Sequence, residues 1–290
     1  MERRSRVEIT HQDRLPESEA EWLQTGKFHV ETVDIDGRPI RCALTRASKK
    51  RSLVTMAGGI PRDPERRKNL PLINKLYGLL ALKLLERDQS GLLYNQPSTG
   101  GSGGQWETET FRSRTAALAD VTQHFSSAVD ASDVALVGTS AGGYMAVRAL
   151  EQLQARGIKI PKLVLLSPGA YPEGIENVPY GAQFTELIRK PWNVAESPVF
   201  PQLERYVHEG GSLQLAFFEA DALTIPPHIE QYYRSFAQKL LREGGNVQLM
   251  TIPGVAHNFR KLGAHEGPPQ TDNESVKSTA LTITDFLTRS

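Results

Sequence analysis

Short apolar runs alternate along the chain with segments in which apolar residues recur at helical spacing. Runs of strand length lie at 52–56, 91–94, 134–137, 162–166, 213–218 and 247–252. Most are followed by a helical pattern, as in Leu118, Val121 and Phe125, which fall on one face of a helix. Because repeated strand–helix units place successive strands in parallel, the pattern predicts an α/β fold, with a mostly parallel sheet flanked by helices.

Three segments depart from this alternation. Residues 1–26 are polar without a clean period, and we interpret them as an N-terminal extension, either on the surface or at the start of a strand. Residues 27–44 contain two β-like runs joined at Asp36-Gly37, a pair typical of hairpin turns. Residues 169–211 are rich in proline and aromatic residues and are predicted to form a small cap insertion. The sequence therefore indicates a single domain over 27–290 that carries this cap.

Two further helices are expected from their own signals. Asp63-Pro64-Glu65 places a capping residue before a proline and a glutamate, which is typical of a helix start. The apolar residues that continue this helix are Leu72, Ile73, Leu76, Tyr77 and Leu80. A second helical pattern at 275–287 is expected to form the last helix.

Composition narrows the class of protein. The chain has 290 residues, with 34 basic and 33 acidic side chains and a formal charge of +1, so nothing indicates nucleic acid or an anionic membrane as a partner. Its single cysteine, Cys42, excludes an intrachain disulfide. The N-terminal residues lack the apolar core of a signal peptide, and no stretch is long enough to span a membrane. We therefore expect a cytoplasmic protein.

The strongest chemical signal is a serine between two glycine-rich positions. Gly138-Thr139-Ser140-Ala141-Gly142-Gly143 follows the apolar run 134–137 and precedes a helical pattern. A serine on a sharp strand-to-helix turn needs neighbours without bulk, which Gly138 and Gly142 provide. The helix that follows directs its free N–H groups toward the serine, which suits a developing negative charge. The alternative is a glycine-rich turn with an idle serine.

Other polar or glycine-rich signals also fall where predicted strands end. They are Gly58-Gly59, the run 100–104, Asp221 and His257. Because ligands bind at the carboxyl ends of parallel strands, we expect these groups to lie at one edge of the sheet. A serine hydroxyl needs a base, and the base needs a carboxylate to hold its tautomer. The order Ser140, Asp221, His257 is the one expected after such a serine turn.

Other residues that could be catalytic or could bind a ligand are explained more simply by structural roles. Glu219 lies two residues before Asp221 and is interpreted as a supporting carboxylate, and His265 as a loop residue. The run 100–104 lacks the spacing of a nucleotide-binding loop. Arg62, Arg66 and Arg67 could bind a substrate carboxylate, although a solvated helix start is favoured. No paired-histidine spacing supports a metal, and no cofactor is expected.

The chain resembles the α/β-hydrolase superfamily from about residue 27 to 290. The matching segments are GTSAGG around Ser140, FFEADALTIP around Asp221 and IPGVAHNF around His257. This resemblance implies Ser140 as nucleophile, Asp221 as acid and His257 as base. YNQPSTGGS is similar to the "YDQPGxGxS" segment of proline iminopeptidases and related hydrolases, with Asn95 in place of Asp and Ser98 in place of the first Gly.

The same resemblance implies an oxyanion hole. One donor is the N–H of Ala141, and the second comes from the turn Gly58-Gly59-Ile60. Relatives often carry His-Gly-x-Pro there, which aligns Ile60 with the donor. Gly59 is the alternative donor, because the motif's glycine can be aligned with Gly58 instead of Gly59, which shifts the donor position one residue earlier. The histidine of that motif is absent here.

These parts predict acyl transfer to water, with a small-molecule carboxylic ester as the favoured substrate. Thioesters, amides, acyl transfer to other acceptors and C–C bond hydrolysis stay open on the same residues, as does a ligand-binding protein without turnover. The cap looks short for an aminopeptidase. Its aromatic residues either line an acyl pocket or form the core of the cap: Tyr171, Tyr180, Phe184, Trp192 and Phe200. The oligomeric state is not predicted.

Overall fold

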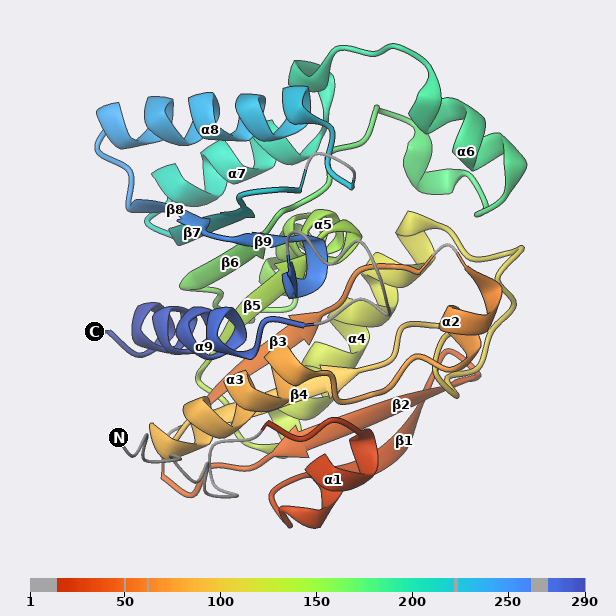
Figure 1. The fold of residues 1–290 in the computed structure, drawn as a ribbon, viewed down its shortest axis with the longest axis vertical. Coiled ribbons are helices and arrows are strands. Elements are labelled where there is room, and N and C mark those ends of the chain that lie inside the picture. Colours follow the sequence, from red (N-terminus) through yellow and green to blue (C-terminus); the bar gives the residue numbers. More distant parts are fainter. Residues whose placement is uncertain (1–14, 50, 62, 222–223, 262–270, 290) are drawn as a thin grey trace, which may run out of the picture.

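The computed structural model describes residues 15–49, 51–61, 63–221, 224–261 and 271–289. Its centre is an eight-stranded sheet in the order β1-β2-β4-β3-β5-β6-β7-β8 (Figure 1). The strands are β1 (His29–Ile35), β2 (Arg38–Thr45), β3 (Ser52–Ala57), β4 (Ser90–Tyr94), β5 (Asp133–Thr139), β6 (Lys162–Leu166), β7 (Ser212–Phe218) and β8 (Val247–Ile252). Strand β2 is antiparallel to both of its neighbours, and all other pairs in this sheet are parallel. The predicted α/β class and the hairpin at Asp36-Gly37 are confirmed.

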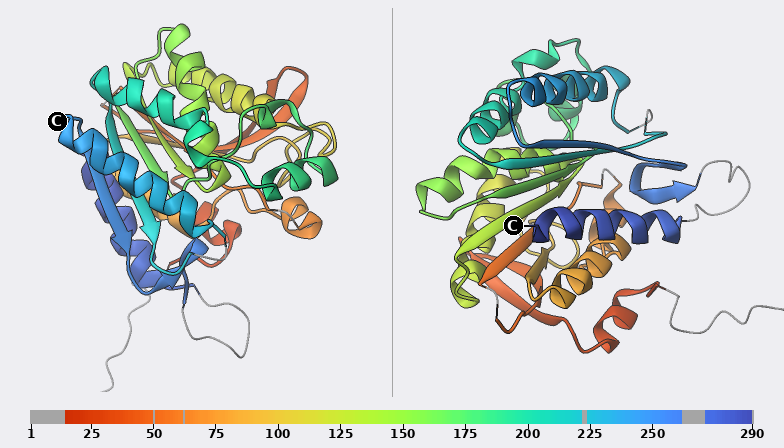
Figure 2. Two further views of the ribbon diagram at one scale, coloured as in Figure 1. Left: turned by 90° about the horizontal axis from the view of Figure 1, so that it is seen from above. Right: turned by 90° about the vertical axis from the view of Figure 1, so that its left-hand side faces the viewer.

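Helices cover both faces of this sheet (Figure 2). They are α1 (Glu19–Gln24), α2 (Pro64–Lys68), α3 (Lys75–Glu86), α4 (Phe111–Ala128), α5 (Ala141–Ala155), α6 (Ala182–Arg189), α7 (Val199–His208), α8 (Pro227–Arg242) and α9 (Asn273–Thr288). Short 3₁₀ turns also lie along the described residues: η2 (Ile175–Asn177), η3 (Val194–Glu196) and η4 (His257–Phe259). In addition, β9 (Val255–Ala256) pairs with β10 (Arg260–Lys261). In the part of the chain that the structure describes, no helix is suited in length and apolarity to cross a bilayer.

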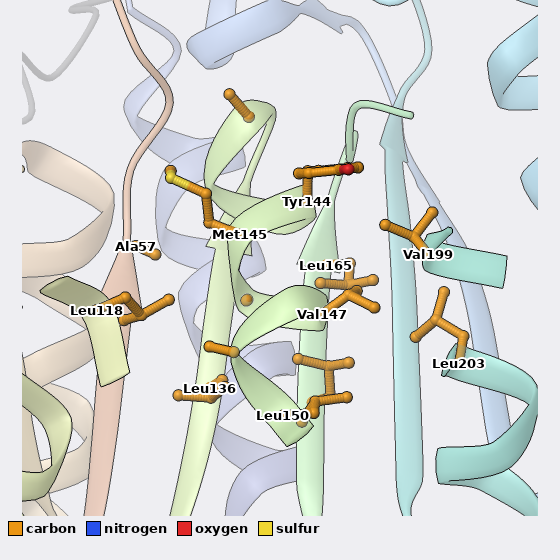
Figure 3. Packing of buried hydrophobic residues seen from close by; sticks show 14 of the residues in the cluster. Ala57, Leu118, Leu136, Tyr144, Met145, Val147, Leu150, Leu165, Val199 and Leu203 are labelled. Carbon is orange, nitrogen blue, oxygen red and sulfur yellow. The ribbon is translucent and has the colours of Figure 1, made fainter. Parts of the chain in front are cut away.

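Successive residues of the central strands enter different cores. Leu136 of β5 packs with α4, α5 and α7, whereas Val137 packs with α3 and α9 on the opposite face. Figure 3 shows Leu136 and Leu165 on either side of Val147 and Leu150 of α5, with Leu203 of α7 on the side of Leu165. Strands covered on both faces are apolar at nearly every position, which explains why short apolar runs located them in the sequence.

The predicted helix from Asp63 is divided in two. Asp63 caps α2 by accepting the Arg66 N–H at 2.8 Å, as the sequence indicates. The chain then leaves the helix before Pro71, since proline lacks an N–H and disfavours helical geometry in the residue before it. Asn74 starts α3 by accepting the Tyr77 N–H at 3.0 Å. The prediction of one helix was therefore wrong: α2 lies at the predicted helix start, α3 contains Leu76, Tyr77 and Leu80, and Leu72 and Ile73 lie between the two helices.

Two other segments contain helices that the pattern did not reveal. Residues 19–24 form α1, whose Trp22 is 1% exposed, so this part of the predicted extension is neither a strand start nor a purely surface segment. Helix α7 lies at the end of the predicted cap, where it packs on α5 and α8. The range 169–211 therefore contains two regular helices, α6 and α7, and its other residues are irregular apart from the turns η2 and η3. The division into one domain with a cap stays a prediction.

Candidate active site

Ser140 lies on the sharp turn between β5 and α5. Its backbone has φ 56° and ψ −125°. Residues other than glycine rarely adopt a positive φ of this kind. Hydrogen bonds hold it there: the Ser140 N–H donates to the Leu166 carbonyl at 2.9 Å, and the Ser140 carbonyl accepts from Gly143 and Gly169 at 3.0 Å each. The strained turn presents a half-buried side chain at the carboxyl end of β5.

The glycines around Ser140 are required by close packing. A Cβ on Gly138 would lie 2.6 Å from the Gly142 carbonyl oxygen. One on Gly142 would lie 2.1 Å from the carbonyl oxygen of Ala57, at the end of β3. Both contacts are shorter than any that real side chains make, so the start of α5 approaches β3 only because these positions lack side chains.

Asp221 and His257 lie together beyond the ends of β7 and β8. The His257 Nδ1 and the Asp221 Oδ2 are 2.7 Å apart, and the two residues are 8% and 2% exposed. A carboxylate bound to Nδ1 holds the imidazole in the tautomer whose Nε2 is free to accept a proton. Among the described residues, the structure records no hydrogen bond between Ser140 and His257. Such bonds often tighten only when substrate binds.

Glu219 has a different contact from Asp221. Its carboxylate accepts the Gly254 N–H at 2.7 Å, which stabilises the turn that leads from β8 toward His257. It is therefore bound to the backbone and not to the imidazole. His265 and Arg62 lie outside the described residues.

The turn after β3 lies directly against Ser140. A Cβ built on Gly59 would be 3.2 Å from the Ser140 Cβ and 3.6 Å from its Oγ. Ala141 is the first residue of α5 and is 6% exposed. These positions place the candidate donors Gly59 and Ile60 in a turn on one side of Ser140, and Ala141 next to it in the chain. Which of Gly59 and Ile60 donates stays a prediction.

A second set of side chains behind this turn was missed in the sequence. Gln96 donates from Nε2 to the Gly58 carbonyl at 2.5 Å, and its Oε1 accepts from Arg114 Nη1 at 3.0 Å. Arg114 is fully buried, and this burial lowers the pKa of its guanidinium. One feature of the sequence could have indicated that Arg114 is buried. It falls on the apolar face of its helix, three residues after Phe111 and four before Leu118.

The segment with two departures from the hydrolase motif has a clear local explanation. Ser98 adopts φ 60°, a conformation for which the glycine of the related motif is better suited. Its hydroxyl accepts from Arg114 Nη2 at 3.0 Å, a contact that glycine could not make. Asn95 donates to the Gly100 carbonyl at 2.7 Å and closes the same loop.

The cap aromatics divide between the two interpretations given above. Tyr180 and Phe200 are buried and belong to the core. The Tyr180 ring stacks on the Trp106 ring, with the ring centres 4.7 Å apart, and Phe200 packs against α8. Tyr171, Phe184 and Trp192 are only half-buried. Tyr171 also lies within 3 Å of a Cβ built on Gly169, the residue that binds the Ser140 carbonyl.

Of the three arginines considered as a substrate site, the structure describes Arg66 and Arg67, whose surroundings differ. Arg66 is exposed, whereas the Arg67 guanidinium lies 3.7 Å from the centre of the Trp106 ring. A group of possible metal ligands, Glu204, His208 and Glu243, lies on α7 and after α8. Lys239 already supplies a cation there, with its Nζ 2.6 Å from Glu204 and 3.9 Å from Glu243.

Comparisons with known proteins agree with this architecture. Est1E from Butyrivibrio proteoclasticus, solved with ferulic acid bound, is 18% identical, with a TM-score of 0.62 over 89% of this chain and 97% of that one. Esterase 2 from Thermogutta terrifontis, phosphorylated by paraoxon, is 16% identical, with a TM-score of 0.56 over 90% and 93%. The thioesterase domain from the curacin biosynthetic pathway is 12% identical, with a TM-score of 0.54 over 90% and 99%. At these identities the likeness shows the fold alone.

A search of curated proteins found no significant match. A model of the Alpha/beta hydrolase family matches residues 75–262, a range that contains Ser140, Asp221 and His257. This match spans more than half of the chain and agrees with the mostly parallel sheet and its flanking helices. The chain therefore belongs to the alpha/beta hydrolase family.

Proposed function

We propose that this protein is a serine hydrolase that cleaves a small carboxylic ester through an acyl-enzyme on Ser140. The observation that carries the proposal is the buried hydrogen bond of 2.7 Å between His257 and Asp221, at the sheet edge where the strained turn holds Ser140. A buried imidazole oriented by a carboxylate is the base that a serine hydroxyl needs in order to act as a nucleophile.

The proposed first half-reaction forms the acyl-enzyme. His257 Nε2 takes the hydroxyl proton of Ser140 as the Oγ attacks the acyl carbon, and Asp221 stabilises the imidazolium that forms. The N–H groups of Ala141 and of Ile60 or Gly59 bind the oxyanion. When the tetrahedral intermediate collapses, the C–O bond to the alcohol breaks, and His257 protonates the departing oxygen.

The second half-reaction returns the free enzyme. His257 removes a proton from water, whose oxygen attacks the acyl carbon, and the same N–H groups bind the second oxyanion. The bond to Ser140 Oγ then breaks, the serine recovers its proton from His257, and the carboxylic acid leaves. No group other than the enzyme's own residues and water is required by this sequence of steps.

Two of the solved structures support an oxygen ester as the substrate. Est1E binds ferulic acid, and the Thermogutta terrifontis enzyme is named an esterase. The half-buried rings of Tyr171 and Phe184 offer an apolar surface for an acyl chain. A thioester is the second candidate, because one similar structure is a thioesterase domain. The leaving group is sulfur in that case, and the roles of Ser140, Asp221 and His257 are unchanged.

Covalent labelling tests the nucleophile. Paraoxon should phosphorylate Ser140, with the Oγ–P bond forming as p-nitrophenolate leaves, and Ser140→Ala should abolish this labelling. Hydrolysis of p-nitrophenyl butyrate should fall by more than about 1,000-fold in that variant, because the nucleophile itself is removed. Mass spectrometry of the labelled peptide and steady-state kinetics provide the two measurements.

Ser132→Ala is the matched control. Ser132 is exposed and directly precedes β5, whereas Ser140 directly follows it, so the two serines lie at opposite ends of this strand. It should label and hydrolyse as the unchanged protein does. Retained labelling in Ser140→Ala would contradict the proposal. Tight binding of esters with no turnover would indicate a ligand-binding protein instead. Comparing kcat/KM for matched oxygen esters and thioesters of increasing acyl length separates the two candidate substrates.

A further inference from the structure

The turn that carries the candidate oxyanion donors is held from behind by two side chains. Gln96 Nε2 donates to the Gly58 carbonyl at 2.5 Å, and the Tyr77 hydroxyl donates to the Ala57 carbonyl at 2.9 Å. In a planar trans peptide, the carbonyl and the next N–H point in opposite directions. The bond from Gln96 therefore fixes the direction of the Gly59 N–H and the position of the residues that follow it.

Arg114 determines which end of the Gln96 amide faces the turn. Its Nη1 lies 3.0 Å from Gln96 Oε1, and a guanidinium has only donors. The carbonyl end of the amide must therefore face Arg114, which leaves the NH₂ end for Gly58. Gln96 is 3% exposed and Arg114 is fully buried, so water does not compete for either bond.

The position of Arg114 is unfavourable for a residue with no role beyond folding. Within the described residues no carboxylate forms an ion pair with it, and its Nε has no hydrogen-bond partner. Its direct contacts include the Ser98 hydroxyl at 3.0 Å and the rings of Trp106 and Tyr180, about 5 Å away, and the Glu109 carboxylate attracts it without forming an ion pair. Ser98 itself adopts a strained backbone, with φ 60°. A buried cation bound mainly to neutral groups destabilises the folded state.

We infer that Gln96 is a positioning residue for the proposed hydrolysis, and that Arg114 holds it in the orientation that fixes the Gly58–Gly59 peptide. Neither side chain touches the reacting atoms. They act through the turn, so that its N–H groups meet the oxyanion without rearrangement when negative charge develops. This inference rests on the proposed function, because it concerns the transition state of the same acyl transfer.

The test is Gln96→Glu, which separates positioning from folding. The carboxylate would pair with Arg114 at least as well as the amide does, but it has no donor for the Gly58 carbonyl. We expect kcat for p-nitrophenyl butyrate to fall about 30-fold, with KM changed less than about two-fold, because the lost interaction matters in the transition state. The melting temperature should stay at or above that of the unchanged protein. The concentration of active sites is measured by titration with paraoxon to completion, and kcat is calculated per active site. Unfolded molecules therefore do not contribute.

Gln202→Glu is the matched control. Gln202 is also buried, its Oε1 accepts from Arg148 Nη1 at 2.6 Å, and its Nε2 has no partner. The same chemical change there removes no donor contact, and kcat should stay within about two-fold. An unchanged kcat in Gln96→Glu would overturn the inference, as would an equal loss in the two variants.

Arg114→Lys provides a second variant that keeps one donor for Gln96 Oε1. Its kcat per titrated site should lie much closer to that of the unchanged protein than to that of Gln96→Glu, and a loss as large as in Gln96→Glu would overturn the inference. If the unchanged protein shows neither paraoxon titration nor Ser140-dependent hydrolysis, the proposed function fails, and the inference fails with it. If titration and hydrolysis are normal while Gln96→Glu is fully active, only the inference fails.

Discussion

Ser140 shows how a single residue concentrates strain where the chemistry is proposed. A left-handed backbone in a residue other than glycine costs about 1–3 kcal/mol, and it persists only where the surroundings hold it. The surroundings are the hydrogen bonds from Ser140 to Leu166 and from Gly143 and Gly169 to Ser140. Strain of this kind keeps the hydroxyl projecting from the sheet edge before any substrate arrives.

Gly142→Ala tests the close approach on which this turn depends. The new Cβ would lie 2.1 Å from the Ala57 carbonyl oxygen and 2.6 Å from that of Gly58, so α5 or the oxyanion turn must move. We expect kcat for p-nitrophenyl butyrate to fall by more than about 100-fold, since the oxyanion donors would be displaced. The melting temperature should fall as well, as measured by circular dichroism.

Gly58→Ala is the comparison for stability. A Cβ at Gly58 would meet nothing closer than Tyr77, at 3.8 Å, so the melting temperature should not change. An active and stable Gly142→Ala protein would show that the start of α5 has more space than these contacts allow.

Among the elements, α1 and α3 make a close contact that the sequence did not predict. A Cβ on Gly78 of α3 would lie 2.8 Å from both Trp22 Cε2 and Ile73 Cγ2. Trp22 also packs edge-on against Phe28, with ring centres 6.2 Å apart. The small residue on α3 therefore makes room for the indole, which joins the N-terminal helix to the face of the sheet covered by α3 and α9.

Gly78→Ala should destabilise the protein by about 1–3 kcal/mol through overpacking, although alanine favours a helix more than glycine does. Urea unfolding measures this change. In a Trp22→Ala background, the cost of Gly78→Ala should shrink because the clashing ring is gone. Equal costs in both backgrounds would show that Trp22 does not limit the space at Gly78.

The elements also show how far the sequence predicted the fold. Strands were located well because both of their faces are buried, so that local apolar runs carried the information. Helix α1 escaped notice because only Trp22 of its six residues is buried, which leaves no period to detect. The break between α2 and α3 depended on Pro71, whose effect outweighed continuous apolar spacing.

The candidate site was predicted in part for a similar reason. Ser140, Asp221 and His257 stand in motifs that follow strand ends, so each could be found in its own segment, and the structure brings Asp221 and His257 into contact. Gln96 and Arg114 are eighteen residues apart and meet Gly58 only in the folded chain. No local sequence pattern predicts the contacts that Gln96 makes with Arg114 and Gly58. The position of Arg114 on an apolar helix face indicated a buried charge, but not its partner.

At the scale of the whole molecule, the predicted cap shares one hydrophobic core with the sheet. Ile175, Tyr180 and Val194 from the cap belong to the same buried cluster as Leu136 and Leu165 of the sheet. Polar bonds add to this contact: Glu176 accepts from Tyr144 at 2.9 Å and from Arg148 at 2.5 Å, both on α5. Because burial is continuous, the cap and the sheet should unfold together.

A protein that keeps Trp192 as its only tryptophan, with Trp22 and Trp106 replaced by phenylalanine, tests this cooperativity. Its tryptophan fluorescence reports on the cap, whereas far-ultraviolet circular dichroism reports on the whole chain. Both signals should change at the same urea concentration, with one midpoint. An earlier midpoint by fluorescence would show that the cap unfolds separately and would contradict the prediction of a single domain.

The buried cysteine of β2 has a practical consequence. Cys42 is fully buried, and desolvation, with a smaller contribution from Glu31, raises its pKa to about 12. At pH 8 only about one thiol in ten thousand is then ionised, so maleimides and other thiol reagents have almost no nucleophile to attack. A cysteine introduced at Leu281 on α9, which is 48% exposed, would be the one reactive thiol of the folded protein. Fluorophores, spin labels or a solid support can thus be attached at a chosen point without first removing the native cysteine.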